Sequence, residues 1–75
     1  MINIKKLDKI RKEYVKLTGY KIKLEICVEY VYVSVTTDRN THWVDRITIA
    51  ELLQSNSPYT RFSNFVENTC ITADL

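Results

Sequence analysis

The stretch Lys21–Val35, KIKLEICVEYVYVSV, decides the fold because it alternates apolar and polar residues without a single Gly, Pro, Asn or Asp. A period of two is that of a β-strand with one buried face. The apolar residues first take the even positions and later the odd ones: Ile22, Leu24 and Ile26, then Val31, Val33 and Val35. At about 3.3 Å per residue, one straight strand of this length would exceed the width of so small a domain. The chain must therefore bend or reverse within this stretch.

The change of direction is expected near Val28–Val31, where the parity of the apolar residues changes. One extra residue in a strand moves every later side chain to the opposite face. Because no turn-forming residue lies between Glu25 and Val31, the sequence favours a bulge or corner in one long strand. A tight reversal without glycine is the alternative.

The residues before this stretch predict an amphipathic helix. Asn3 suits its N-cap, and Gly19 suits the position after its C-terminus, which adopts the left-handed conformation. Its apolar residues recur at spacings of three and four, as on one face of a helix: Ile4, Leu7, Ile10, Tyr14 and Leu17. Val15 falls beside them on a helical wheel.

The residues after it predict a turn, a strand and a short helix. The segment 37–41 contains Asp and Asn, which favour turns, and a strand from His42 to about Ile47 follows. Thr48 stands three residues before Glu51, as in a capping box that opens a helix.

A last short helix is predicted from Ser57 and Pro58, which suit an N-cap and a first helical position. Its apolar stripe consists of Tyr59, Phe62, Phe65 and Val66. We expect this helix to fray near Asn68, and the tail to add an edge strand or stay loose.

Together these elements predict a single α+β domain over residues 1–75. It has an N-terminal amphipathic helix, a two- or three-stranded antiparallel sheet with a bent or bulged long strand, and two short C-terminal helices. The sequence after Met1 lacks the long apolar run of a signal peptide or a membrane span. We therefore expect a soluble, cytoplasmic protein without membrane contact, with Cys27 and Cys70 as reduced thiols. Its oligomeric state stays open.

Charge is distributed unevenly, although the formal net charge is only +2. Basic residues dominate residues 1–23, and acidic residues outnumber them in the remainder. On a helical wheel four lysines of the first helix share a narrow arc, which we call the lysine stripe: Lys5, Lys9, Lys12 and Lys16. Such a stripe is either a contact for phosphates or for an acidic protein surface, or simply a solvated helix face.

No set of residues predicts an enzyme. A thiol nucleophile needs a base within hydrogen-bond reach, and His42 is the only histidine available to Cys27 or Cys70. These three residues cannot supply the four ligands of a structural zinc site. Gly19, the only glycine, is used as a helix cap, so no glycine-rich phosphate loop exists. We predict no catalytic residues, no metal and no cofactor.

The segment Asp38–Trp43, which we call the hairpin tip, is the other candidate contact. Arg39 and Trp43 are of the types most enriched at binding hot spots, and loops on a rigid sheet often carry recognition. Trp43 has an alternative fate, turning inward to cover the core. In that case the alternation leaves Asp38, Arg39 and His42 as an exposed polar group.

Two features are shared with RNA-binding proteins. Tyr30 and Tyr32 alternate as stacking residues do in RNA-recognition sheets, but the segment 27–29 lacks the basic residue and glycine of that motif. We interpret both tyrosines as core and sheet-surface residues. The order of helix, strands and helix is also similar to that of the double-stranded RNA-binding domain. The lysine cluster that begins the last helix in that family is replaced here by Ser57–Tyr59.

In size and organisation the chain resembles small phage-encoded inhibitors, notably the type II anti-CRISPR proteins. The capped helix between Asn3 and Gly19, the segment VYVSVTTDRNTHWV and the closing helices at Ile49 and Pro58 carry this resemblance. The acidic members of that group mimic DNA, whereas this chain is slightly basic. The acidic contacts that such mimicry would use are Glu25, Glu29, Asp38 and Asp45.

The resemblance implies a protein-binding module that blocks a larger host enzyme, such as a nuclease or a nucleoprotein complex, in the host cytoplasm. We expect its contacts to be Asp38, Arg39, His42 and Trp43 of the hairpin tip and Lys5, Lys9, Lys12 and Lys16 of the lysine stripe. The alternative is a small nucleic-acid-binding module that uses the basic first helix.

Overall fold

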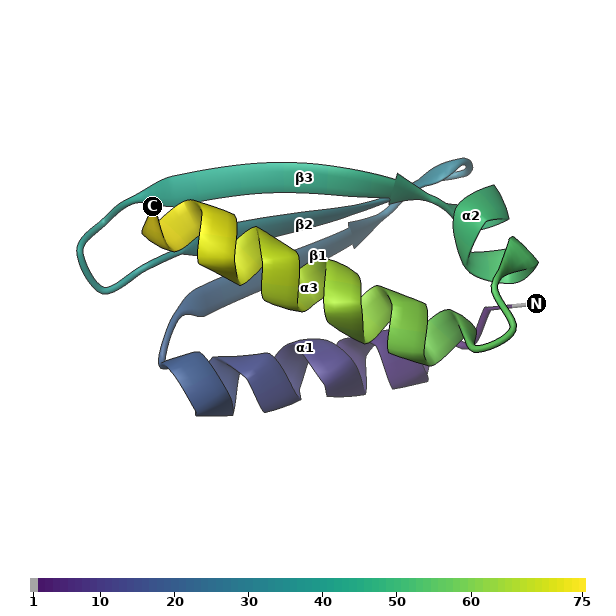
Figure 1. Cartoon of the computed structure of the whole chain (residues 1–75), viewed down its shortest axis with the longest axis horizontal. Coiled ribbons are helices and arrows are strands. Elements are labelled where there is room, and N and C mark those ends of the chain that lie inside the picture. The colour runs from purple at the N-terminus through teal and green to yellow at the C-terminus, as the bar shows by residue number, and fades with distance from the viewer. Residues whose placement is uncertain (1) are drawn as a thin grey trace.

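The structure, a computed structural model, describes residues 2–75 and is an α+β fold of two layers. Three strands form one antiparallel sheet in the order β1-β2-β3. Helices α1 and α3 lie side by side against one face of this sheet (Figure 1). The elements are α1 (Ile4–Thr18), β1 (Lys21–Ile26), β2 (Tyr30–Thr36), β3 (His42–Thr48), α2 (Ile49–Gln54) and α3 (Pro58–Asp74). The predicted fold class is confirmed.

The predicted bulge in one long strand is wrong, because β1 and β2 are separate strands joined by a tight reversal. Ile26 is paired with Val31, and the backbone N–H of Cys27 donates to the carbonyl oxygen of Tyr30 at 2.8 Å. Only Val28 and Glu29 lie between them. Since a loop with an even number of residues pairs even positions with odd ones, the hairpin itself produces the change of parity.

This turn needs no glycine. In residues 2–75, positive φ angles occur only at Gly19 and Asn40, so Val28 and Glu29 keep ordinary backbone conformations. The carbonyl of Glu29 also accepts a hydrogen bond of 2.9 Å from the backbone N–H of Ile49, at the start of α2. A contact distant in sequence therefore helps to hold the reversal.

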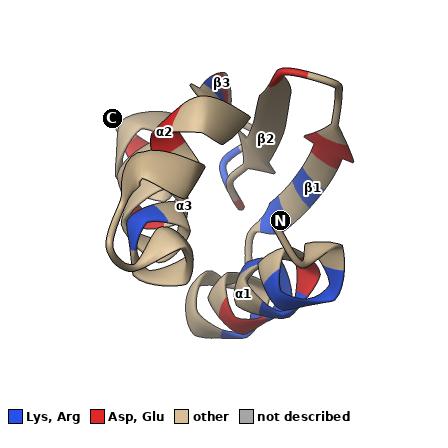
Figure 2. Ribbon diagram, turned by 90° about the vertical axis from the view of Figure 1, so that its right-hand side faces the viewer, with Lys and Arg blue, Asp and Glu red and all other residues tan. Residues whose placement is uncertain are grey.

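The face of the sheet under the helices, the inner face, carries the core. Val31, Val33 and Val35 of β2 are fully buried there, as the alternation predicts. The opposite, outer face carries no helix (Figure 2) and presents the alternate residues of each strand, most of which are polar. Twelve hydrophobic residues are buried among residues 2–75: Leu7, Ile22, Val31, Val33, Val35, Ile47, Leu52, Phe62, Phe65, Val66, Cys70 and Ala73.

Both predicted ends of α1 are confirmed. The side-chain oxygen of Asn3 accepts a hydrogen bond of 3.0 Å from the backbone N–H of Lys5, and Gly19 has a φ of 74°. The predicted apolar stripe is only partly buried, because α1 packs mainly against β1 and α3. At its two ends Ile4 and Leu17 are 58% and 78% exposed.

The last helix is longer than predicted. It continues to Asp74, so the predictions of fraying near Asn68 and of a loose or strand-forming tail are wrong. Thr69, Cys70 and Ala73 are buried and extend the apolar stripe by two more turns, which gives these turns a reason to stay ordered. Pro58 occupies the start of the helix, but the side chain of Ser57 makes no capping hydrogen bond. Within residues 2–75, no helix is long and apolar enough to cross a membrane.

Candidate functional site

The lysine stripe lies fully on the surface. All four of its lysines are exposed, and only Lys12 lies near a carboxylate, with its Nζ 3.4 Å from Asp8. Figure 2 shows that the basic residues of α1 and of β1 lie on the same side of the molecule. The basic half of the sequence is therefore also one basic side of the structure.

Two side chains of the hairpin tip, those of Arg39 and His42, bond to other parts of the protein. Nη2 of Arg39 lies 2.6 Å from the Asp74 carboxylate and also donates to its backbone carbonyl. This ion pair ties the tip to the end of α3. Nδ1 of His42 lies 2.9 Å from the Thr36 hydroxyl, while Trp43 is 44% exposed.

The two predicted contact regions come from different elements of the fold. The hairpin tip lies between β2 and β3, next to the C-terminal end of α3, whereas the lysine stripe follows α1 along the lower edge of the molecule in Figure 1. They have to be tested as separate surfaces.

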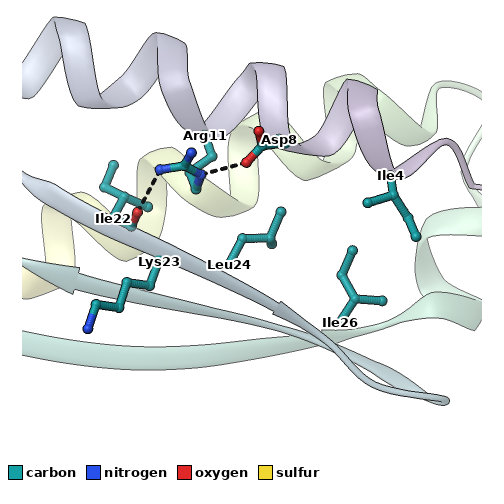
Figure 3. A pocket seen from close by; sticks show the side chains of 7 residues that line it. All are labelled: Ile4, Asp8, Arg11, Ile22, Lys23, Leu24 and Ile26. Carbon is teal, nitrogen blue, oxygen red and sulfur yellow. Dashed lines mark hydrogen bonds and ion pairs between the residues drawn. The ribbon is translucent and has the colours of Figure 1, made fainter.

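A groove that the sequence did not predict runs between α1 and β1 (Figure 3). We call it the edge groove, because it follows the free edge of the sheet. Its volume is about 580 Å³, and it is lined by Ile4, Asp8, Arg11, Ile22, Lys23, Leu24 and Ile26. Arg11 lies across one part of it and donates through Nε to Asp8 at 2.8 Å and through Nη1 to the Ile22 carbonyl at 3.0 Å.

The groove continues into a second hollow, which we call the end cavity. It has a volume of about 180 Å³ and shares Ile4 and Ile26 with the groove. All of its lining side chains are aliphatic: Ile2, Ile4, Leu7, Ile26, Val31, Ile49 and Leu53. Leu53, at its rim, is 52% exposed. An apolar hollow beside exposed aliphatic side chains is a typical place for an apolar anchor from another molecule.

Sequence reasoning missed both hollows for a physical reason. The alternation in β1 correctly predicts that Ile22, Leu24 and Ile26 share the inner face. It does not show how completely α1 covers them, which depends on the position of the helix relative to the edge of the sheet. The one available signal is Ile4, a large apolar residue in the first turn of α1, which is partly exposed in the structure.

Asp8 is the carboxylate of the groove, and Arg11 is the first cause of its lowered pKa; Lys12 acts in the same direction. Because the folded-state pKa lies below its ordinary value of 3.8, folding is stabilised above that value and loses this contribution as the pH falls through the folded-state pKa. We expect Asp8→Asn to be less stable than wild type at neutral pH, and the difference to shrink as the pH falls below 3.8 and the wild-type carboxylate takes up a proton. Urea denaturation across this pH range measures the difference, and a gap that did not shrink would mean that the side chain acts through something other than its charge.

The two thiols have opposite environments. Cys27 is exposed and Cys70 is buried, and burial raises the pKa of the Cys70 thiol. We therefore expect a thiol reagent to modify Cys27 rapidly and Cys70 only on unfolding. Mass spectrometry after brief labelling, with and without denaturant, measures this; rapid labelling of both sites in the folded protein would contradict the burial of Cys70.

The residues considered for catalysis are not assembled into a site. His42 contacts hydroxyl groups of β2, Cys27 lies at the β1–β2 turn, and Cys70 is in the core. Across residues 2–75, no group of three or more His, Cys, Asp or Glu side chains could hold a metal ion. Comparisons with protein-family models, with curated proteins and with solved structures find no match.

Proposed function

We propose that this protein is a small protein-binding module that acts by occupying a surface of a larger partner. An inhibitor of a host enzyme, as in the phage-encoded inhibitors that the chain resembles, is the form of this function that we favour. The observation that carries the proposal is the apolar end of the molecule. There the aliphatic end cavity opens beside exposed Ile4 and Leu53, and Val28 is exposed in the adjacent turn.

The exposed apolar residues at this end form one contiguous surface, whereas single exposed apolar residues are common on any protein. The hollows near this end share lining residues, since Ile4 joins the groove to the end cavity, and Ile49 and Leu53 join the cavity to a further hollow beside Val28. A contiguous apolar surface on a small domain is costly in water unless a partner covers it. Trp43 is a second contact to test, because it is of the hot-spot type and nearly half exposed.

The test is capture of partners from a host lysate by wild type and matched variants. Leu53→Asp places a charge at the rim of the end cavity, and Leu17→Asp makes the same change at an exposed site at the other end of α1. We expect Leu53→Asp to lose the partner and Leu17→Asp to retain it, with circular dichroism confirming that both fold. Trp43→Ala and Arg39→Ala, in parallel, report on the hairpin tip. A protein captured equally by all variants would contradict both surfaces.

Nucleic-acid binding is a second candidate, favoured by the exposed lysine stripe and by the β1 lysines on the same side (Figure 2). Titration of duplex and single-stranded DNA and RNA in a series of salt concentrations tests it, because affinity that comes from phosphate contacts falls steeply with salt. On the protein-binding proposal we expect no binding even at low salt. Tight, salt-sensitive binding that Lys9→Glu abolishes would favour this second candidate instead.

A further inference from the structure

We propose that the edge groove binds an extended, acidic segment of the partner protein, which adds to the sheet as a strand beside β1 and places an apolar side chain in the end cavity. This inference rests on the proposed protein-binding function and names the mode of binding and the chemistry of the partner.

The free edge of β1 offers backbone hydrogen-bonding groups to an added strand. In an antiparallel pair, residues alternate between those whose N–H and C=O groups face the neighbouring strand and those whose groups face away. The Cys27 N–H donates to Tyr30, so odd-numbered residues of β1 face β2. Leu24 and Ile26 therefore turn their backbone groups outward, along the free edge of the sheet. The hydrogen bond from Arg11 to the Ile22 carbonyl shows that this edge accepts donors from outside the sheet.

An apolar groove lies directly beside that edge. Figure 3 shows the side chains of Leu24 and Ile26 pointing from β1 towards α1, with Ile4 facing them from the helix. A strand placed along this edge would direct alternate side chains into this apolar groove and the others towards the outer face. The groove ends at Ile4 and Ile26, where the end cavity begins. One aliphatic side chain of the added strand could thus enter a hollow that has only aliphatic walls.

The charged side chains around the groove indicate which residues the added strand should carry. On β1, Lys21, Lys23 and Glu25 are exposed on the outer face, so the net charge of this face of the strand is positive. On α1, Lys5 and Lys9 line a hollow that borders the groove at Ile4 and Asp8. The Asp8 carboxylate is already paired with Arg11 and Lys12. An added strand therefore meets net positive charge on both sides, which favours acidic residues alternating with apolar ones.

The same charge argues against the other occupants of the groove. A second copy of this chain, paired along the same edge, would bring its lysine-rich α1 beside this one, and like charges brought together across an interface are destabilising. A nucleic acid supplies the negative charge but has no peptide backbone to pair with Leu24 and Ile26, and no aliphatic group for the end cavity. An acidic protein segment supplies all three.

The test uses a defined probe, a synthetic ten-residue peptide that alternates glutamate with valine, titrated into the isotope-labelled protein. We expect amide shifts centred on Leu24 and Ile26 and slower hydrogen exchange of these two amides. Two altered peptides are the controls: one with lysine in place of glutamate, and one methylated on the backbone nitrogens that would face β1. Each should bind at least about tenfold more weakly, because the first reverses the charge and the second removes main-chain hydrogen bonds.

Two protein variants complete the design. Lys23→Glu should weaken binding of the glutamate peptide by about three- to tenfold, whereas Lys16→Glu, an equal change of charge outside the groove residues, should have less effect. Equal binding of the methylated peptide, or no shift at Leu24 and Ile26, would overturn strand addition. Dimerisation in sedimentation experiments, or an oligonucleotide that shifts these amides when the peptide does not, would overturn the choice of partner.

These outcomes separate the two proposals. If lysate capture depends on Leu53 but the peptides do not bind, the protein-binding function stands and strand addition fails. If the peptides bind as expected but no partner is captured through the apolar end, the groove has the proposed chemistry and the proposed function fails.

Discussion

Replacing Phe62 with alanine is expected to lower the free energy of unfolding by about 3–5 kcal/mol. Phe62 is fully buried on α3, with its ring centroid 6.2 Å from that of Phe65, and α3 packs against β2 and β3. Removing the ring loses its transfer free energy and leaves a cavity. Because a domain of this size has a total stability of only about 5 kcal/mol or little more, most of the variant should be unfolded or close to it at 25 °C. Urea denaturation followed by circular dichroism measures the loss.

Ile71→Ala is the matched control for this change. It lies on the same helix and is likewise a large apolar residue replaced by alanine, but it is exposed. We expect its effect to stay within about 0.5 kcal/mol. If the two variants were equally stable, α3 would not pack on the sheet through the Phe62 face, and the core described above would be incorrect.

The fold could be predicted largely because its signals are local. The alternation in β1 and β2 marks two half-buried strands, and Asn3 and Gly19 mark the ends of α1 by capping chemistry that involves only neighbouring residues. The capping role of Thr48 is confirmed for the same reason, since its hydroxyl accepts a hydrogen bond of 3.0 Å from the Glu51 N–H. Such features need no knowledge of tertiary contacts.

The errors arise where distant contacts decide. The tight turn at Val28 and Glu29 is supported by a hydrogen bond from the backbone N–H of Ile49 to the carbonyl of Glu29, twenty residues earlier in the chain. The last two turns of α3 persist because Cys70 and Ala73 reach the core. Neither fact is contained in local propensity. The tail of α3 also holds Asp74, whose carboxylate pairs with Arg39.

For the candidate site, too, features set by neighbouring residues can be predicted from sequence, and features set by distant contacts cannot. The sequence identifies the lysine stripe correctly as an exposed set, because helical periodicity alone fixes it. It does not show that Arg39 pairs with Asp74, because this ion pair joins positions far apart in the chain. It misses the edge groove, which exists only because α1 leaves part of β1 uncovered. Surfaces made by a single element can be predicted from sequence, whereas surfaces made between two elements need the structure.

Replacing Leu7 with alanine is expected to lower the free energy of unfolding by about 2–5 kcal/mol. Leu7 is the one residue of α1 that is fully buried, so this helix depends on it for its attachment to the core.

The effect should lie in the upper part of this range, since Leu7 also lines the end cavity and its loss would enlarge a hollow that already exists. Thermal denaturation gives the change in stability, and amide exchange should show α1 opening before the sheet. Leu17→Ala is the control on the same helix, where we expect almost no change because that side chain is 78% exposed. Equal losses for the two variants would mean that α1 is held along its whole apolar stripe. In that case Ile4 would also be packed, and the groove and cavity on which the proposed binding mode depends would be closed.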